Sequence, residues 1–194
     1  MDKLKGKKIG VAITGSFCTF GITLDCINEL IKNGAIVTPI LSYNTSELDT
    51  KFGEAKKFKQ NLFNLTGSKL IETIPETEPI GPGKILDALV VLPATGNTLA
   101  KITAGIADTP ASFAVKSQLR NARPIILGVS SNDALSTGAK NIGHLLNTKN
   151  IYFIPFGQDD CVNKPCSIVF KEDYVTEAVA LALEGKQIQP IIVQ

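Results

Sequence analysis

The sequence predicts an α/β fold: a three-layer sandwich built on a doubly wound parallel sheet of about six strands. Short apolar runs alternate along the chain with longer stretches in which apolar residues recur every three or four positions. Strands that alternate with helices are typical of parallel sheets with right-handed crossovers. The chain has 194 residues and no internal repeat, so we expect a single domain over residues 1–194.

Six apolar runs have the length of strands. Residues 8–14 end at Gly15, a turn residue, and residues 87–93 are apolar, as expected of a strand that is buried on both faces. The predicted strands are residues 8–14, 35–42, 69–73, 87–93, 124–129 and 151–156.

Amphipathic stretches follow most of these strands. Residues 19–32 have apolar residues at helical spacing, and the helix ends before Gly34 because glycine accepts the left-handed conformation past a helix end. A lysine-rich helix follows the second strand, with Ser46 as its predicted cap. The other predicted helices are residues 97–108, 111–121, 134–147 and 173–184. Residues 74–84 contain three prolines and two glycines, so we predict a shaped loop there.

Composition excludes several classes of protein. The 20 Lys and Arg residues against 18 Asp and Glu residues give a net charge of +2, too little for a nucleic acid or an anionic membrane as main partner. No apolar run is long enough to span a membrane, and no signal peptide is recognised, so we expect a cytoplasmic protein with free thiols. Four cysteines without CxxC spacing and one histidine argue against a zinc site.

Small polar residues and glycine follow four of the predicted strands. These turns begin at Thr14, Ser42, Pro93 and Ser130. The carboxyl ends of parallel strands lie at one edge of a sheet, and helix-start amides with hydroxyl donors there suit a phosphate group without lysine. Helix capping alone is the simpler explanation of any one turn. Four turns at one edge favour a phosphorylated ligand.

Familiar nucleotide motifs are missing. Gly10 and Gly15 have the spacing of a phosphate loop, but Ser16 stands where that loop requires lysine. The GxGxxG fingerprint is absent, and Ser42 replaces the acidic residue that would bind a dinucleotide ribose. No predicted strand ends in aspartate, which excludes a phosphoryl-accepting receiver domain. A mononucleotide remains.

Residues 93–102 (PATGNTLAKI) and the following residues 105–108 (GIAD) resemble the PASANT-type motif of the homo-oligomeric FMN-binding flavoproteins, a family that includes cysteine decarboxylases. Gly15-Ser16 is similar to the first phosphate turn of that family. Further stretches resemble the branch of the family that takes part in dipicolinate synthesis in spore-forming bacteria. They are residues 78–82, 119–121, 131–135 and 152–160.

The resemblance implies FMN as the cofactor. The first turn would offer amides, a hydroxyl and, in Phe17, a lid over the flavin, while Ser42 would donate to the phosphate. The implied cofactor-binding residues are Gly15, Ser16, Phe17, Ser42, Ala94, Thr95, Asn97, Thr98, Ser130 and Ser131, the last two beside the ring edge.

The resemblance also implies an activity and partners. The reaction would be the oxidation of dihydrodipicolinate to dipicolinate with NADP, in the mother-cell cytoplasm during sporulation. A separate A subunit would bind the nicotinamide, and this chain would bind FMN or form part of the site for the dicarboxylate substrate. We expect a homo-oligomer, a trimer or a multiple of it. The alternatives are an FMN-dependent decarboxylase or prenyltransferase-like flavoprotein, and a non-catalytic chain that scaffolds the A subunit.

The chain departs from the decarboxylases of this family. Residues 46–93 contain no histidine, and no methionine accompanies Asn132. The single histidine, His144, lies in a predicted helix, where a position on the surface or the edge of the core is expected. These departures disfavour decarboxylation but leave FMN binding in place.

The sequence does not identify a catalytic residue. Lys116 and Arg120 share a helix face and Arg123 follows, so these cations could bind a dicarboxylate, although a solvated helix surface is the simpler interpretation. Glu78, in the loop rich in proline and glycine, is a candidate proton acceptor or a structural residue. Cys18, at the start of the first helix, is a candidate thiolate, with a small buried residue as the favoured interpretation.

Overall fold

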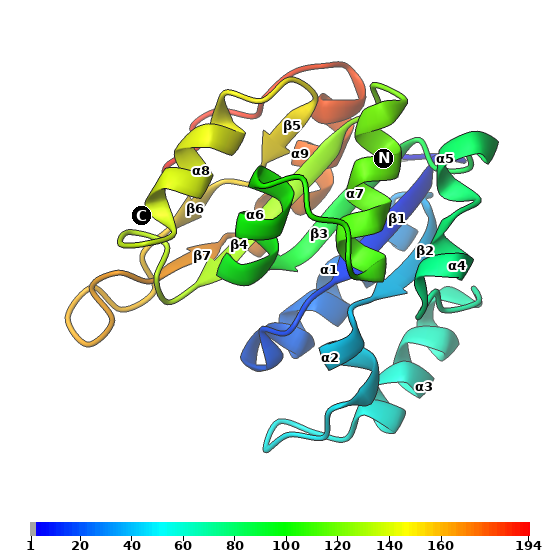
Figure 1. Cartoon of the computed structure of the whole chain (residues 1–194), viewed down its shortest axis with the longest axis horizontal. Helices are drawn as coiled ribbons and strands as arrows, with labels where there is room; N and C mark the ends of the chain where they lie inside the picture. Colours follow the sequence, from blue (N-terminus) through cyan, green and yellow to red (C-terminus); the bar gives the residue numbers. More distant parts are fainter. Residues whose placement is uncertain (1–2) are drawn as a thin grey trace.

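A mixed sheet forms the middle layer of the protein (Figure 1). The computed structural model describes residues 3–194, and within them the sheet has seven strands. Five of these pair in parallel in the order β2-β1-β3-β4-β5. The strands are β1 Lys8–Ile13, β2 Ile36–Leu41, β3 Ala88–Ala94, β4 Ile125–Ser131, β5 Ile151–Phe153, β6 Phe156–Gly157 and β7 Ile168–Phe170. The predicted α/β sandwich is confirmed.

Helices cover both faces of the sheet. On one face pack α1 (Phe20–Lys32), α3 (Ala55–Thr66) and α9 (Val175–Leu183). On the other face pack α6 (Gly96–Thr103), α7 (Pro110–Arg120) and α8 (Ala139–Leu146). Shorter elements complete the chain: 3-10 turns at Phe17–Thr19 and Glu172–Tyr174, and the helices α2 (Tyr43–Glu47), α4 (Ile74–Thr77) and α5 (Ile80–Gly83).

Side chains of the central strands alternate between two apolar cores. In β3, Val90 and Leu92 enter the core under α1 and α9, whereas Leu89 and Val91 enter the core under α6 and α7. All four are fully buried. This is why the strand is a continuous apolar run in the sequence. A strand with one solvent-exposed face would alternate apolar and polar residues.

The region between β2 and β3 differs from its prediction. The strand expected at residues 69–73 is reduced to one parallel bridge between Ile40 and Ile71. The loop expected at residues 74–84 contains the one-turn helices α4 and α5. Thr73 caps α4, and a proline in its first turn costs no hydrogen bond, because helix-start amides have no partner within the helix.

Two further predictions near the sheet edges are wrong. Ser46 does not cap the lysine-rich helix: it lies inside the short helix α2, which Ser42 caps, and α3 begins later, after Glu54. The sheet is not wholly parallel, because β7 pairs antiparallel with the end of β4, and β6 with β7. These two strands have two and three residues, too few to leave a periodic pattern in the sequence.

The strand order reverses at β1, which has β2 on one side and β3 on the other. In open α/β sheets, ligands bind in the crevice outside the carboxyl ends of the strands at such a switch point. The turns after β1 and β3 lie at this place. Among residues 3–194, no helix combines the length and the apolar character needed to cross a bilayer.

Candidate functional site

Thr14 joins the turn after β1 to the turn after β3. Its hydroxyl donates to the carbonyl oxygen of Pro93 at 2.7 Å and accepts from the backbone N–H of Thr95 at 3.3 Å. The side chain is buried. Two segments that are about eighty residues apart in the chain are thereby held edge to edge at the switch point.

A contact between two serines joins the turn at the end of β4 to the turn after β1. The hydroxyl oxygens of Ser16, after β1, and Ser130, near the end of β4, are 3.0 Å apart. The turns after β1, β3 and β4 therefore meet at one edge of the sheet, as the sequence predicted. The turn after β2 lies beside them, because the backbone N–H of Ser42 donates to the carbonyl oxygen of Ile13 at the end of β1.

Two hollows open on either side of Gly15 and Thr95, which line both of them. Each has a volume of about 390 Å³. The first, which we call the α6 hollow, is lined by Ser42, Asn97, Thr98, Lys101 and Asp108. The second, which we call the β4–β7 hollow, is lined by Ser16, Ser130, Ser131, Asp133, Asp159 and Lys164.

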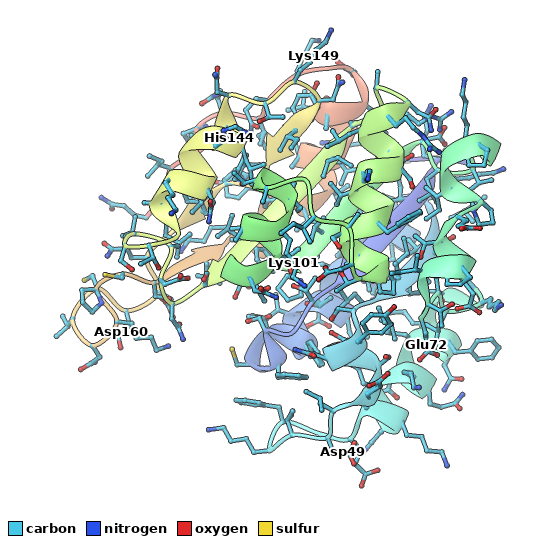
Figure 2. All side chains as sticks on the ribbon, viewed as in Figure 1. Asp49, Glu72, Lys101, His144, Lys149 and Asp160 are labelled. Carbon is cyan, nitrogen blue, oxygen red and sulfur yellow. The ribbon has the colours of Figure 1, made fainter. Side chains whose placement is uncertain are left out.

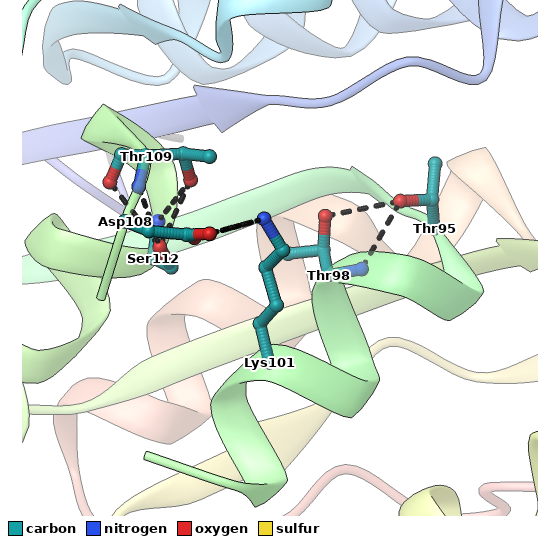
Figure 3. A network of polar contacts seen from close by, with 6 residues as sticks. All are labelled: Thr95, Thr98, Lys101, Asp108, Thr109 and Ser112. Carbon is teal, nitrogen blue, oxygen red and sulfur yellow. Dashed lines mark hydrogen bonds and ion pairs between the residues drawn. The ribbon is translucent and has the colours of Figure 1, made fainter. Parts of the chain in front are cut away.

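The α6 hollow is built around the start of a helix. Thr95 caps α6: its hydroxyl accepts from the backbone N–H of Thr98 at 3.3 Å and lies 3.0 Å from the Thr98 hydroxyl (Figure 3). The first amides of the helix, at Gly96 and Asn97, have no partner within the helix and carry the positive end of its dipole. Of these two residues Asn97 lines the hollow, so the positive end of the helix lies at its edge.

An ion pair lines the same hollow. The Nζ atom of Lys101 is 2.8 and 2.9 Å from the two carboxylate oxygens of Asp108 (Figure 3). The hydrogen bond from Lys101 lowers the pKa of the Asp108 carboxyl. The sequence analysis did not single out this pair, although Lys101 and Asp108 both lie in the stretches that resemble the PASANT-type motif. Their seven-residue spacing does not by itself indicate a contact.

Ser42 has a structural role of its own. It caps α2 and is nearly buried, and its hydroxyl lies 2.9 Å from the hydroxyl of Thr45. The capping explanation is therefore correct for Ser42 as well as for Thr95. Capping does not use all the hydrogen-bonding capacity of a hydroxyl, which has one donor and two acceptor sites.

Acidic side chains distinguish the β4–β7 hollow. Ser131 donates a hydrogen bond to the carboxylate of Asp133, and Thr137 donates to it at 2.9 Å. These bonds, that of Ser131 first, lower the pKa of Asp133. Opposite them, Lys164 pairs with Asp159 at 3.1 Å on the exposed loop between β6 and β7. These carboxylates were not among the candidate residues predicted from the sequence.

Cys18 lines the β4–β7 hollow as well. Its sulfur lies 3.7 Å from the hydroxyl of Ser16, and the residue is exposed. The interpretation of Cys18 as a small buried residue is therefore wrong. The buried cysteine of this region is Cys26, on α1, and its burial raises the pKa of the thiol to about 12.

Two of the predicted cofactor residues lie outside the hollows. Phe17 lines a separate aromatic groove, with its ring centroid 5.1 Å from that of Phe20. The side chain of Ala94 is buried in the core under α6 and α7, so only its main chain could reach a ligand. The other eight predicted residues line one or both hollows.

The candidate substrate cations are not at this edge of the sheet. Arg123 donates to the carbonyl oxygen of Leu86 and pairs with Asp87 at 3.7 Å, both just before β3. Arg120 ends α7, a helix that begins beside the α6 hollow and runs away from it. Lys116 is exposed on the same helix. The interpretation as a solvated surface fits Lys116 and Arg120, whereas Arg123 is partly buried and held by Leu86 and Asp87.

Glu78 and His144 are both exposed and line neither hollow. His144 lies on α8, and Figure 2 shows it on a different part of the molecule from Lys101. The surface position expected for His144 is confirmed. Across residues 3–194, the structure contains no group of three or more side chains suited to hold a metal ion.

Gly15 leaves space for a ligand. A Cβ atom added there would meet no protein atom closer than 3.7 Å, although the residue lies between two hollows. Packing of the protein itself therefore does not require glycine at this position. Neutral hydroxyls, helix-start amides and the two paired lysines, Lys101 and Lys164, are donors that suit a phosphate ester.

Comparison with known proteins agrees with this architecture. The Flavoprotein family matches residues 1–178. The chain is 43% identical over 194 residues to the B subunit of dipicolinate synthase from Bacillus subtilis (strain 168), covering 100% of this chain and 97% of that one. It superposes on the crystal structure of the corresponding B subunit from Bacillus halodurans C with a TM-score of 0.91 and 38% identity, over 98% of both chains.

A more distant structure shares the fold. It is AnUbiX (PadA1) in complex with FMN and dimethylallyl pyrophosphate, with a TM-score of 0.61 and 19% identity over 78% of each chain. From the extent of the family match and of the full-length similarity, the chain belongs to the Flavoprotein family.

Proposed function

We propose that this member of the Flavoprotein family binds FMN and acts as the B subunit of a dipicolinate synthase. The complete enzyme would oxidise dihydrodipicolinate to dipicolinate with NADP as acceptor. Similarity over the whole chain to a protein of that name supports the role. The observation that carries the proposal is the pair of hollows that share Gly15 and Thr95 at the switch point of the sheet.

The residues around the hollows suit a flavin mononucleotide. Ser16, Thr95 and Asn97 would hold the phosphate and ribityl groups by hydroxyls and amides, and Gly15 leaves the space that a close approach needs. A bound flavin supplies two-electron chemistry, which matches the removal of two hydrogens to form an aromatic pyridine ring. The chain itself contributes orientation of the bound groups and exclusion of water from the crevice.

The nicotinamide is assigned to another chain. This sequence has no GxGxxG fingerprint, so we assign NADP to an A subunit. The proposal includes a homo-oligomer of this chain, in the mother-cell cytoplasm of a spore-forming bacterium. It leaves the binding of the substrate dicarboxylate to groups that other chains supply, because Arg120 and Arg123 lie away from the hollows.

A decarboxylase or prenyltransferase function is less well supported. Either reaction needs an acid or base beside the ring. The acids in the β4–β7 hollow are Asp133 and Asp159, and hydrogen bonds from Ser131 and Ser167 lower their pKa values. Both are therefore ionised at neutral pH, and their lowered pKa values make them poor proton donors and weak bases.

Binding of FMN tests the first half of the proposal. We expect Ser16→Ala, in the β4–β7 hollow, and Asn97→Ala, in the α6 hollow, each to weaken FMN affinity by about 5- to 10-fold, because one neutral hydrogen bond contributes about 1 kcal/mol. Quenching of flavin fluorescence measures the affinity, and circular dichroism checks folding. Asn64→Ala, on the exposed surface of α3, is the matched control and should bind FMN normally.

Reconstitution with an A subunit tests the second half. Dipicolinate formation should require both chains and should increase when FMN is added to the stripped complex. Full activity of the A subunit alone would assign this chain a scaffolding role. A chain without measurable FMN affinity would overturn the flavin assignment.

A further inference from the structure

Lys101 places a positive charge in a hollow whose hydrogen-bond donors are otherwise neutral. Among the described residues that line the α6 hollow, the side chains charged at neutral pH are Lys101 and its partner Asp108. The hollow is therefore balanced in charge, and Asp108 does not repel an incoming anion as it would without the lysine. If the hollow contained only hydroxyls and amides, its affinities for a sugar alcohol and for a phosphate ester would differ less than they do with a lysine present.

The ammonium group is held in position. The Lys101 side chain is 22% exposed, whereas that of Asp108 is 55% exposed, so the cation is the sheltered member of the pair. Side chains of a helix point towards its amino-terminal end, and Asn97 lies one turn earlier on the same helix. Lys101 and Asn97 line the same hollow, which brings the ammonium group near the free amides at the start of α6.

The pair leaves hydrogen-bonding capacity for a ligand. An ammonium group has three N–H donors, and the two contacts with the Asp108 carboxylate use at most two of them. The third can be donated to an anion without breaking the pair. Asp108 directly precedes Thr109, which caps α7 by accepting from the backbone N–H of Ser112 at 3.2 Å, so the main chain next to Asp108 is held by a helix start (Figure 3).

From these contacts we infer that Lys101 makes the α6 hollow selective for a phosphate dianion over an uncharged hydroxyl, and that Asp108 positions the ammonium group for this contact. The inference rests on the proposed binding of a flavin mononucleotide and names the residue that recognises its phosphate. Lys101 is thus a specificity-determining residue and Asp108 a positioning residue.

The test compares FMN with riboflavin, which is the same molecule without the phosphate. In Lys101→Gln, we expect FMN affinity to fall by about 10- to 100-fold, the range for a hydrogen bond to a charged group, while riboflavin affinity stays within about 3-fold. In the same variant FMN affinity should rise with salt concentration, because salt screens the repulsion between the phosphate and Asp108, which no longer has a partner. Lys116→Gln, on the exposed face of α7, removes the same charge elsewhere and should change neither ligand.

The outcomes separate this inference from the proposed function. If the unaltered chain binds neither flavin, the proposed function fails. If it binds FMN and Lys101→Gln keeps the full preference for FMN over riboflavin, the inference fails and the proposed function stands. Loss of the preference in Lys164→Gln instead would move the phosphate to the β4–β7 hollow and overturn the inference. A purely bracing role for the Lys101–Asp108 pair predicts a lower melting temperature with an unchanged preference.

Discussion

The two hollows that share Gly15 and Thr95 are held by different kinds of structure. The α6 hollow lies between the capped starts of α6 and α7, and its lysine is 22% exposed. The β4–β7 hollow is bordered by the loop between β6 and β7, and its lysine, Lys164, is 53% exposed. The comparison shows that the edge of the sheet determines where a ligand can bind. The elements around each hollow, helix caps in one case and a loop in the other, determine how rigidly its side chains are held.

A methyl group on Gly15 is expected to have the largest effect, because this residue borders both hollows. In Gly15→Ala the added Cβ meets no protein atom closer than 3.7 Å, so the chain should fold normally. The methyl occupies space at the junction, and we expect FMN affinity to fall by about 10- to 100-fold, a cost of about 1–3 kcal/mol for overpacking. Fluorescence titration measures it.

Gly143→Ala is the matched control for this substitution. Gly143 lies within α8 with open space around it, so alanine should leave FMN affinity unchanged and raise the melting temperature slightly. If Gly15→Ala binds FMN as well as the unaltered chain does, the two hollows do not form one site.

Protection of Cys18 by FMN against chemical modification is expected to be a smaller effect than that of Gly15→Ala. It reports on the β4–β7 hollow alone. Iodoacetamide should modify the exposed Cys18 at pH 8 and should leave Cys26 unmodified, because Cys26 is buried and its thiol has a pKa of about 12. Saturating FMN should slow the modification of Cys18. Peptide mass spectrometry follows each site.

Cys161 gives the internal comparison, since it is exposed and does not line the hollow. Its rate should not change with FMN. Equal slowing at Cys18 and Cys161 would indicate a general change in the protein and would remove the β4–β7 hollow from the ligand site.

The smallest expected effect is a change in the titration of Asp133. Hydrogen bonds, mainly from Ser131, lower the pKa of this carboxyl in the folded chain. Its ionised form therefore stabilises the fold above the pKa of the unfolded chain, and this contribution is lost as the pH falls through the folded pKa. In Ser131→Ala the pKa of Asp133 should rise towards its ordinary value, so the stabilising contribution should be smaller and its loss should be complete at a higher pH.

Carbon-13 NMR of the carboxyl groups measures this titration directly. Asp108 is the comparison in the other hollow: its pKa is lowered by Lys101 and should not respond to Ser131→Ala. An unchanged pKa of Asp133 would show that Ser131 does not hold that carboxylate.

The sequence predicted the α6 hollow better than the β4–β7 hollow, for physical reasons. Thr95 and Asn97 follow a long, fully buried strand, whose end is marked by the change from apolar to small polar residues. The residues of the β6–β7 loop could not be placed, because these strands of two and three residues form only through the pairing of β7 with β4 and of β6 with β7. Asp159 and Lys164 were missed for this reason.

Contacts across the sheet edge also lay beyond sequence reasoning. The bond from Thr14 to Pro93 and the contact between Ser16 and Ser130 depend on which strands are neighbours. Periodicity gives the strands but does not give their order. The short helices α4 and α5 form in a segment rich in proline and glycine, for which local propensity predicts a loop. Both helices pack against α7, and this packing outweighs the local propensity.

Amide NMR during an FMN titration tests the central claim most directly, namely that the turns after β1, β3 and β4 grip one flavin mononucleotide. The account predicts that the amide signals of Gly15, Asn97 and Ser131 shift together and fit a single dissociation constant. Shifts confined to one turn, or different constants for different turns, would contradict it.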